Sequence, residues 1–185
     1  MAAERGATSI ELLVAAAIGT LLAGAALALC AAGNRAVAAL GAHQTEWQHA
    51  RAAAALWAAE WRGSGYDPSG GSGAGVTRLA PDTMEFSSDW NGDGALLPTG
   101  SNPNERLSWA APPDSWRRGV NGGPRLAIAW MEGPRFEYLD AAGAPLPERP
   151  PPGAARVATA RTRLRGLGEG AWIPIAFRAA RRNPP

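Results

Sequence analysis

The amino-acid sequence predicts an α+β protein in which one long N-terminal helix precedes a mainly antiparallel β-sheet domain. Two observations support this prediction. Residues 10–62 combine an apolar run with a proline-free stretch of helical periodicity, whereas residues 63–185 are divided into short runs by glycine, proline and asparagine. A helix followed by a series of strands is an element order typical of α+β folds.

The first part of the predicted helix is apolar on all sides. Residues 10–32 read IELLVAAAIGTLLAGAALALCAA, and Glu11 is their only charged residue. This length is close to the ~20 residues that a membrane-spanning helix needs. Arg5 precedes the run, which favours a cytoplasmic N-terminus. A cleaved secretory signal would end at a small-residue site with a change of composition, but here an alanine-rich helix continues.

Glu11 is the most informative residue of this run. A carboxylate inside an apolar span costs roughly 3 kcal/mol on insertion scales, so it is normally retained for a partner. Arg5 lies six residues earlier in the sequence, and residues at that spacing do not face each other on a helix. We therefore expect Glu11 to meet a positive group of another chain or a newly formed α-amine.

The segment GATSIELLV, which begins at Gly6, resembles the processing motif of type IV prepilins and type II secretion pseudopilins. The resemblance implies that a prepilin peptidase cuts between Gly6 and Ala7 and methylates the new N-terminus at Ala7. It also implies that Glu11 and Thr8 act in assembly, with Glu11 meeting the amine of a neighbouring subunit. Ala7 differs from the phenylalanine of most members, and Ala28 replaces the proline that is common in major pilins.

The helix is expected to continue beyond the membrane and to pack there on a globular domain. Apolar residues recur at helical steps on one stripe, with Glu46 and Glu60 flanking it, and the stripe contains Leu40, Trp47, Ala50, Ala54, Trp57 and Trp61. We predict one helix over residues 7–62, about 80 Å long at ~1.5 Å per residue. Gly63 and Gly65 are expected to end it.

Short runs bounded by turn residues predict strands in the rest of the chain. The expected strands are Met84 to Ser88, Glu105 to Trp109, Arg125 to Trp130, Arg135 to Leu139, Ala155 to Arg165 and Trp172 to Phe177. The segments WAAEWRGSGYDPSG, FEYLDAAGAPL and IPIAFRAARRNPP resemble parts of PilW-like minor pilins and GspJ-like pseudopilins. The expected organisation is a leader (1–6), a transmembrane and assembly half-helix (7–33), an amphipathic half-helix (34–62) and a periplasmic β-rich domain (63–185).

Composition argues against most catalytic and nucleic-acid-binding classes. Two histidines and one cysteine leave little for a zinc site or a nucleophile–base pair, so we expect no enzymatic activity. His43 is expected to pack, His49 to be exposed and Cys30 to be a small apolar helix residue. The net charge is only +2, and an arginine-rich segment at 156–182 gives no more than a weak indication of DNA or lipid contact.

One loop has the start of a calcium-binding pattern. Asp89, Asn91 and Asp93 form D-x-N-x-D-G, which alternates oxygen ligands before a glycine. The twelfth position is Gly100 instead of glutamate, and Glu105 follows five residues later. The loop is therefore either a hairpin turn built on Asn-Gly and Asp-Gly or a turn stabilised by calcium. Trp90 and Trp116 are expected in loops, and the other tryptophans in the helix stripe or in strands.

The resemblance implies a structural protein stored in the bacterial inner membrane, with a single pass, a cytoplasmic N-terminus and a periplasmic domain. As a minor pilin-like subunit it would join or initiate a type IV pilus or a type II secretion pseudopilus. Its implied partners are prepilin peptidase, other pilins or pseudopilins through their N-terminal helices, and membrane lipid before assembly. No cofactor is expected apart from the calcium interpretation. The alternative is a signal-anchored periplasmic ligand- or calcium-binding domain that is not assembled.

Overall fold

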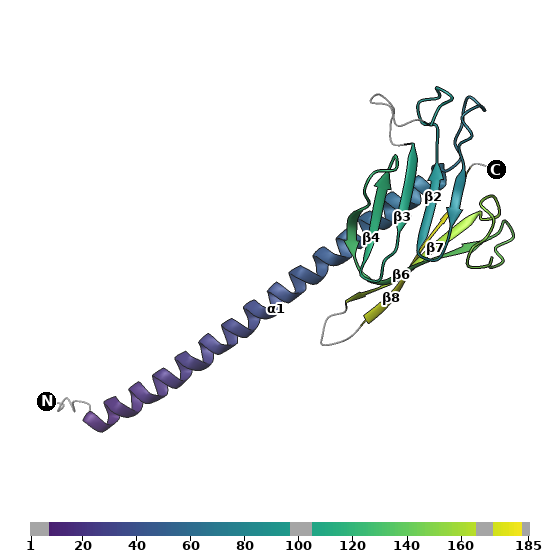
Figure 1. The fold of residues 1–185 in the computed structure, drawn as a ribbon. Coiled ribbons are helices and arrows are strands. Elements are labelled where there is room, and N and C mark those ends of the chain that lie inside the picture. The colour runs from purple at the N-terminus through teal and green to yellow at the C-terminus, as the bar shows by residue number, and fades with distance from the viewer. Residues whose placement is uncertain (1–7, 97–104, 166–171, 183–185) are drawn as a thin grey trace. The chain divides into compact units, whose positions relative to one another are not determined.

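The computed structural model describes residues 8–96, 105–165 and 172–182 and contains one helix followed by eight strands (Figure 1). The elements are α1 (Ser9–Gly63), β1 (Val76–Leu79), β2 (Thr83–Ser87), β3 (Arg106–Ala110), β4 (Ser115–Val120), β5 (Leu126–Trp130), β6 (Glu132–Leu139), β7 (Val157–Arg165) and β8 (Trp172–Ala180). The chain forms two compact units, Met1–Ala42 and His43–Pro185, which are described separately. This architecture confirms the predicted α+β class.

The first unit consists, in its described part, of the N-terminal portion of α1. Every described side chain from Thr8 to Ala42 is exposed, including the apolar ones and Cys30. The helix is long and apolar enough to span a membrane. The observed start at Ser9 agrees with the predicted helix, although Ala7 lies outside the described residues.

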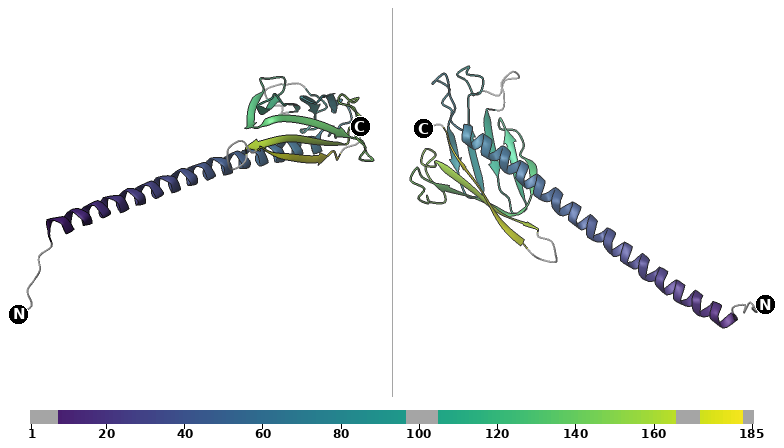
Figure 2. Two further views of the ribbon diagram at one scale, coloured as in Figure 1. Left: turned by 90° about the horizontal axis from the view of Figure 1, so that it is seen from below. Right: turned by 180° about the vertical axis from the view of Figure 1, so that it is seen from behind.

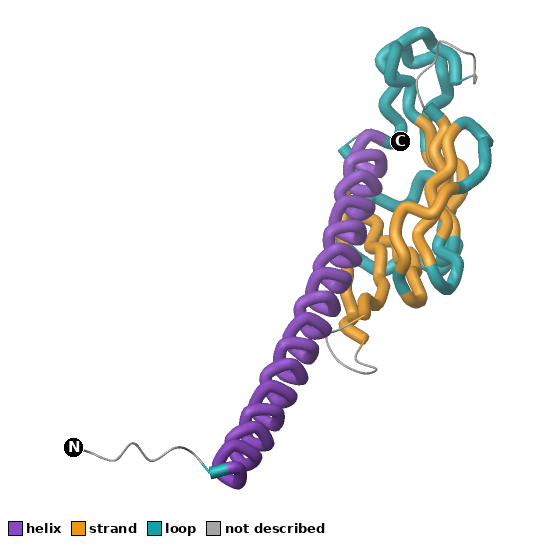
Figure 3. The backbone as a smooth tube through the Cα atoms, turned by 90° about the vertical axis from the view of Figure 1, so that its left-hand side faces the viewer, coloured by secondary structure: helices purple, strands orange, loops and turns teal. Residues whose placement is uncertain are grey.

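The second unit packs the C-terminal part of α1 against antiparallel strands (Figures 2 and 3). Strands β1 to β5 form one sheet in sequence order, and β6, β7 and β8 form a second sheet. The predicted stripe is confirmed where the helix meets the sheets, because Ala50, Ala54, Trp57 and Trp61 are buried. Leu40 belongs to the first unit and is exposed.

Aromatic rings fill the core of the second unit. The Trp116 ring centroid lies 5.8 Å from that of Trp57, 5.7 Å from Trp109 and 6.1 Å from Phe136. The expectation that Trp116 lies in a loop was wrong, because it is fully buried on β4. Its strand, SWRRGV, contains two arginines and no apolar run, so the sequence pattern does not reveal it. Trp90 does lie in a loop, where it stacks on Tyr66.

The six expected strands correspond to β2, β3 and β5 to β8, whereas β1 and β4 were not anticipated. The side chains of β7 alternate between the two faces of its sheet: Ala158 and Ala160 are buried, while Arg161 and Arg163 are exposed. The helix ends where expected, and Gly65 adopts a φ of 77°, a left-handed conformation that glycine accepts without steric cost.

Candidate functional site

The residues expected to act in assembly lie at the start of α1, where Thr8 and Glu11 cap the helix. The Thr8 backbone N–H donates to Glu11 Oε2 at 2.7 Å, and the Glu11 N–H donates to Thr8 Oγ1 at 3.3 Å. This reciprocal pair is a capping box, which satisfies two of the helix's otherwise unpaired N–H groups. Gly6 and Ala7, the expected cleavage and methylation residues, lie outside the described residues.

The capping hydrogen bond leaves acceptor positions of the Glu11 carboxylate free. An ionised carboxylate offers about four acceptor positions, so a single backbone N–H leaves acceptor capacity for an incoming amine. The positive end of the helix dipole also favours a negative charge here. Glu11 is exposed. The arrangement thus combines a local capping role with a carboxylate that a second chain can reach.

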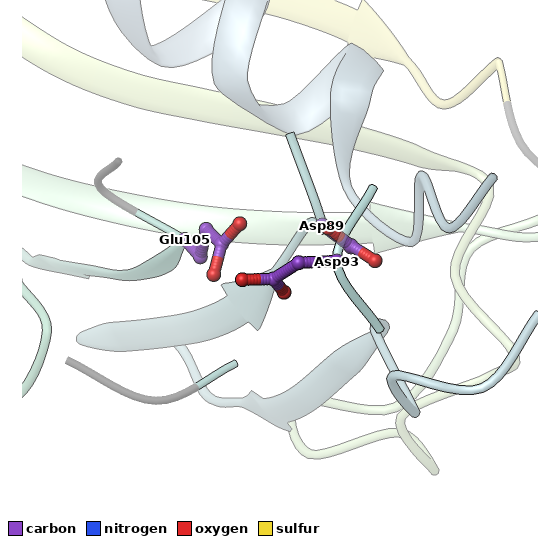
Figure 4. A group of neighbouring side chains, drawn as sticks. All are labelled: Asp89, Asp93 and Glu105. Carbon is purple, nitrogen blue, oxygen red and sulfur yellow. The ribbon is translucent and has the colours of Figure 1, made fainter. Parts of the chain in front are cut away.

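A second candidate site gathers three carboxylates beside the strands. Oxygen atoms of Asp89, Asp93 and Glu105 all lie within 4.8 Å of one another (Figure 4). Asp89 and Glu105 are buried, with Glu105 only 1% exposed, while Asp93 is exposed. Carboxylate oxygens are the ligands that Ca²⁺ prefers. Among the described residues, this is the single group of histidine, cysteine and acidic side chains able to hold a metal ion.

Asp89 also builds the turn itself. Its Oδ1 accepts the Gly92 N–H at 2.7 Å, and its Oδ2 accepts the Gly94 N–H at 3.0 Å. Both glycines have φ above 70°, which favours glycine over other residues. The hydrogen bonds expected of the turn interpretation are therefore present, and they leave the calcium interpretation open as a prediction.

The structure replaces one of the three predicted metal ligands: the acidic cluster contains Glu105 in place of Asn91. The Asn91 side-chain amide donates to Asp93 Oδ2 at 2.9 Å, so Asn91 stabilises the carboxylate of Asp93. Glu105, too late in the sequence for a twelve-residue calcium loop, is brought to the cluster by chain pairing, since the Ser88 N–H donates to its carbonyl oxygen at 2.9 Å. The strand register of β2 and β3, and not the spacing within the loop, is the signal that could have identified it.

A neighbouring loop is organised around Asp67. Its Oδ1 accepts the Ser69 hydroxyl and the Gly70 N–H, each at 2.8 Å, and its Oδ2 accepts the Ser72 N–H at 3.0 Å. Hydrogen bonding from Ser72, with smaller contributions from Ser69 and Gly70, holds the pKa of Asp67 below its usual range. Ser69 also lies 3.4 Å from Asp89 Oδ2, which links the two loops.

The histidines lie apart from the acidic cluster. His43 is half-buried with its ring 5.9 Å from Trp47, and His49 is exposed, as the sequence predicted for each. Glu60, expected to flank the apolar stripe, is buried and accepts hydrogen bonds from the sheet. Its charge is matched there by Arg118 on β4, a partner that the sequence did not reveal.

Comparison with known proteins finds no matching protein family, no similar curated protein and no similar solved structure. The architecture is pilin-like: one long N-terminal apolar helix followed by antiparallel sheets. Functional assignment therefore depends on the residues and geometry of this chain.

Proposed function

We propose that this protein is a pilin-like minor subunit, processed after Gly6, that joins or initiates a type IV pilus or a type II secretion pseudopilus. The observation that carries the proposal is an apolar helix whose described residues up to Ala42 are exposed on all sides and contain one carboxylate, Glu11, in the first turn. The proposed role is structural and needs neither a catalytic centre nor a cofactor. The expected partners remain prepilin peptidase, other pilin-like subunits and inner-membrane lipid.

The exposed apolar side chains of the first unit form a surface that is stabilised when lipid or protein buries it. They include Ile10, Leu12, Leu13, Val14, Ile18, Leu21, Leu22, Leu27, Leu29 and Val37. An exposed apolar surface of this kind marks a membrane or protein interface. In our proposal lipid covers it before assembly, with the N-terminus cytoplasmic and the β-domain periplasmic, and neighbouring helices cover it afterwards.

Mass spectrometry of the chain from cells with an active prepilin peptidase tests the processing step. We expect a mature N-terminus at Ala7, with methylation of its amine. A chain that retains Met1 in such cells would contradict the proposal.

The capping geometry gives a sharper test of Glu11 than a single variant does. Glu11→Val removes both the capping acceptor and the charge, whereas Glu11→Gln keeps a capping acceptor and removes only the charge. We expect both variants to insert into the membrane and both to impair filament assembly. Normal assembly of Glu11→Gln beside impaired assembly of Glu11→Val would assign Glu11 to helix capping instead of a charge pair between subunits.

A second candidate function is an anchored calcium-binding domain that is not assembled into a filament. It is favoured by the clustering of Asp89, Asp93 and Glu105. Calcium-dependent protection of the full chain from proteolysis, together with an unprocessed N-terminus, would support it. Processing at Gly6 would exclude it as the sole function.

A further inference from the structure

The outer face of the five-stranded sheet, which points away from the aromatic core, contains a polar groove. The inner side chains of β2 and β3, such as Phe86 and Trp109, are buried, while Glu85 and Ser108 of the same strands pair on the opposite face. The groove has a volume of about 970 Å³. Its walls come from the loop at Ser72 and from the β4–β5 turn at Gly122.

The floor of the groove depends on a glycine. Gly119 pairs with Ser108, and a Cβ added to Gly119 would lie 2.5 Å from Ser108 Oγ and 2.9 Å from Arg125 Cγ. Glycine is therefore needed for close approach at this position. Its absent side chain lets Arg125 cross the sheet, where Nε donates to Ser108 Oγ at 3.1 Å and Nη2 pairs with Glu85 at 2.7 Å.

The charge of the groove is positive. Among the described residues that line it are three arginines, Arg106, Arg117 and Arg125, and one carboxylate, Glu85. Glu85 is already paired with Arg125. Arg106 is exposed and forms no ion pair within the described part of the chain. Arg117 donates from Nε to Ser115 Oγ at 3.1 Å and has a 3.9 Å contact with Asp114 through Nη2. Exposed ion pairs at that distance are weak, so the Arg106 guanidinium and the terminal nitrogens of Arg117 are available to an anion.

The lining also indicates what kind of anion fits. The one aromatic ring among the described lining residues, that of Phe86, is 1% exposed and faces the core. Sugars and nucleic-acid bases are usually bound by stacking on exposed rings, and the described lining of this groove offers none. Serine and threonine hydroxyls with planar guanidinium groups instead suit a peptide backbone that carries carboxylates.

We propose that this groove binds an extended acidic peptide segment of a partner subunit, whose carboxylates pair with Arg106 and Arg117. The identity of the partner as a neighbouring pilin-like subunit rests on the proposed function. The acidic character of the bound segment does not depend on the proposed function, because it follows from the residues of the groove alone.

Fluorescence anisotropy with the full chain in detergent micelles tests this proposal. The probe is a fluorescein-labelled peptide of alternating Glu and Ser, and the reference peptide has Lys at each Glu. We expect saturable binding of the acidic peptide alone, and at least tenfold weaker binding by the Arg106→Glu/Arg117→Glu variant, which corresponds to about 1.4 kcal/mol. The matched control is Arg163→Glu/Arg178→Glu, two exposed arginines on the second sheet with the same charge change. It should weaken binding less than about twofold, since distant exposed charges are screened.

A variant that binds the acidic peptide more tightly cannot owe this effect to misfolding, so it complements the variants that weaken binding. Glu85→Gln releases Arg125 from its ion pair and should tighten peptide binding by about threefold, in line with the strength of an exposed pair. Equal loss of binding in both double variants, unchanged binding by Glu85→Gln, or tighter binding of duplex DNA than of the acidic peptide would overturn the proposal. Peptide binding does not need cleavage at Gly6, so absent binding with normal processing refutes only the groove. Normal binding without processing refutes only the filament function.

Discussion

Arg118 on β4 and Glu60 on α1 form a largely buried ion pair that joins the sheet to the helix within the second unit. Arg118 donates from Nε and Nη2 to Glu60 Oε1 at 2.8 and 2.5 Å. The other carboxylate oxygen, Oε2, accepts the Trp109 indole N–H at 2.7 Å. The side chains of Arg118 and Glu60 are 19% and 10% exposed. A charge this far from water needs its partner, so the pair defines how this part of the helix lies on β3 and β4.

We predict that Glu60→Ala lowers the free energy of unfolding by about 3 kcal/mol, because it leaves the Arg118 charge and the Trp109 N–H buried without an acceptor. Chemical unfolding of the full chain in detergent, followed by tryptophan fluorescence, measures the change. Glu46→Ala, which removes an exposed carboxylate from the same helix, should alter it by less than about 0.5 kcal/mol. The double variant Glu60→Ala/Arg118→Ala should lose less free energy of unfolding than the sum of the losses in the two single variants. Strict additivity would show that the pair is not coupled.

The sequence was sufficient to predict the helix and most strands because both depend on local periodicity. The stripe containing Trp57 and Trp61 repeats at helical spacing. In β7, small apolar residues such as Ala160 and arginines such as Arg161 fall on opposite faces of the strand. Strand β4 was missed for the same reason. Its buried tryptophan stands beside Arg117 and Arg118, and the burial of Arg118 depends on a carboxylate 58 residues away.

The candidate sites were predictable only where their residues are close in sequence. The Asp89 turn and the segment at Glu11 are local motifs. Glu105 joins Asp89 through strand pairing, and Glu60 meets Arg118 through packing, so no spacing rule along the chain could identify either relationship. The groove at Gly119 likewise depends on which strands are neighbours.

Trp116 should contribute more to stability than any surface tryptophan. It contacts Trp57, Trp109, Phe136 and Phe177 and is fully buried. We expect Trp116→Ala to lower the free energy of unfolding by about 4 kcal/mol through lost burial and a residual cavity.

The matched comparison for Trp116 is Trp90→Ala, which removes a ring that is 45% exposed and stacked on Tyr66. This change should cost about 1 kcal/mol. The same unfolding experiment measures both variants, and equal losses would contradict the placement of Trp116 in the core.

Calcium should stabilise the protein if the acidic cluster holds it. Carboxylate oxygens of Asp89, Asp93 and Glu105 lie within 4.8 Å of one another, a spacing at which a cation between them would offset their mutual repulsion. A Ca²⁺ concentration 100-fold above the dissociation constant would add about 2.7 kcal/mol to the free energy of unfolding. We expect the wild-type thermal midpoint to rise with Ca²⁺ and to fall back with a chelator. Glu105→Gln, which removes one ligand charge, should abolish most of the rise. Equal responses of the variant and the wild type would leave the cluster as a turn without a metal.

Asp67 should make the stability of the second unit depend on pH on the acid side. Hydrogen bonding from Ser72 lowers the pKa of Asp67 in the folded protein below the unfolded value of about 3.9. The folded state therefore favours the ionised form, and the resulting stabilisation is fully present above that unfolded value. It is lost as the pH falls through the lower, folded-state pKa, because protonation removes the charge that the loop N–H groups and hydroxyls bind.

We consequently expect wild type to melt at a higher temperature than Asp67→Asn above pH 5, and the difference to shrink below about pH 4. Asparagine resembles the protonated acid, so the two proteins should converge as Asp67 itself takes up a proton. Thermal midpoints from circular dichroism at steps of pH measure this convergence. Asp82→Asn, at an exposed carboxylate in the β1–β2 turn, controls for the change in net charge. A difference between wild type and Asp67→Asn that grows as the pH falls would contradict the expected sign, since it would mean that the loop favours the protonated carboxyl.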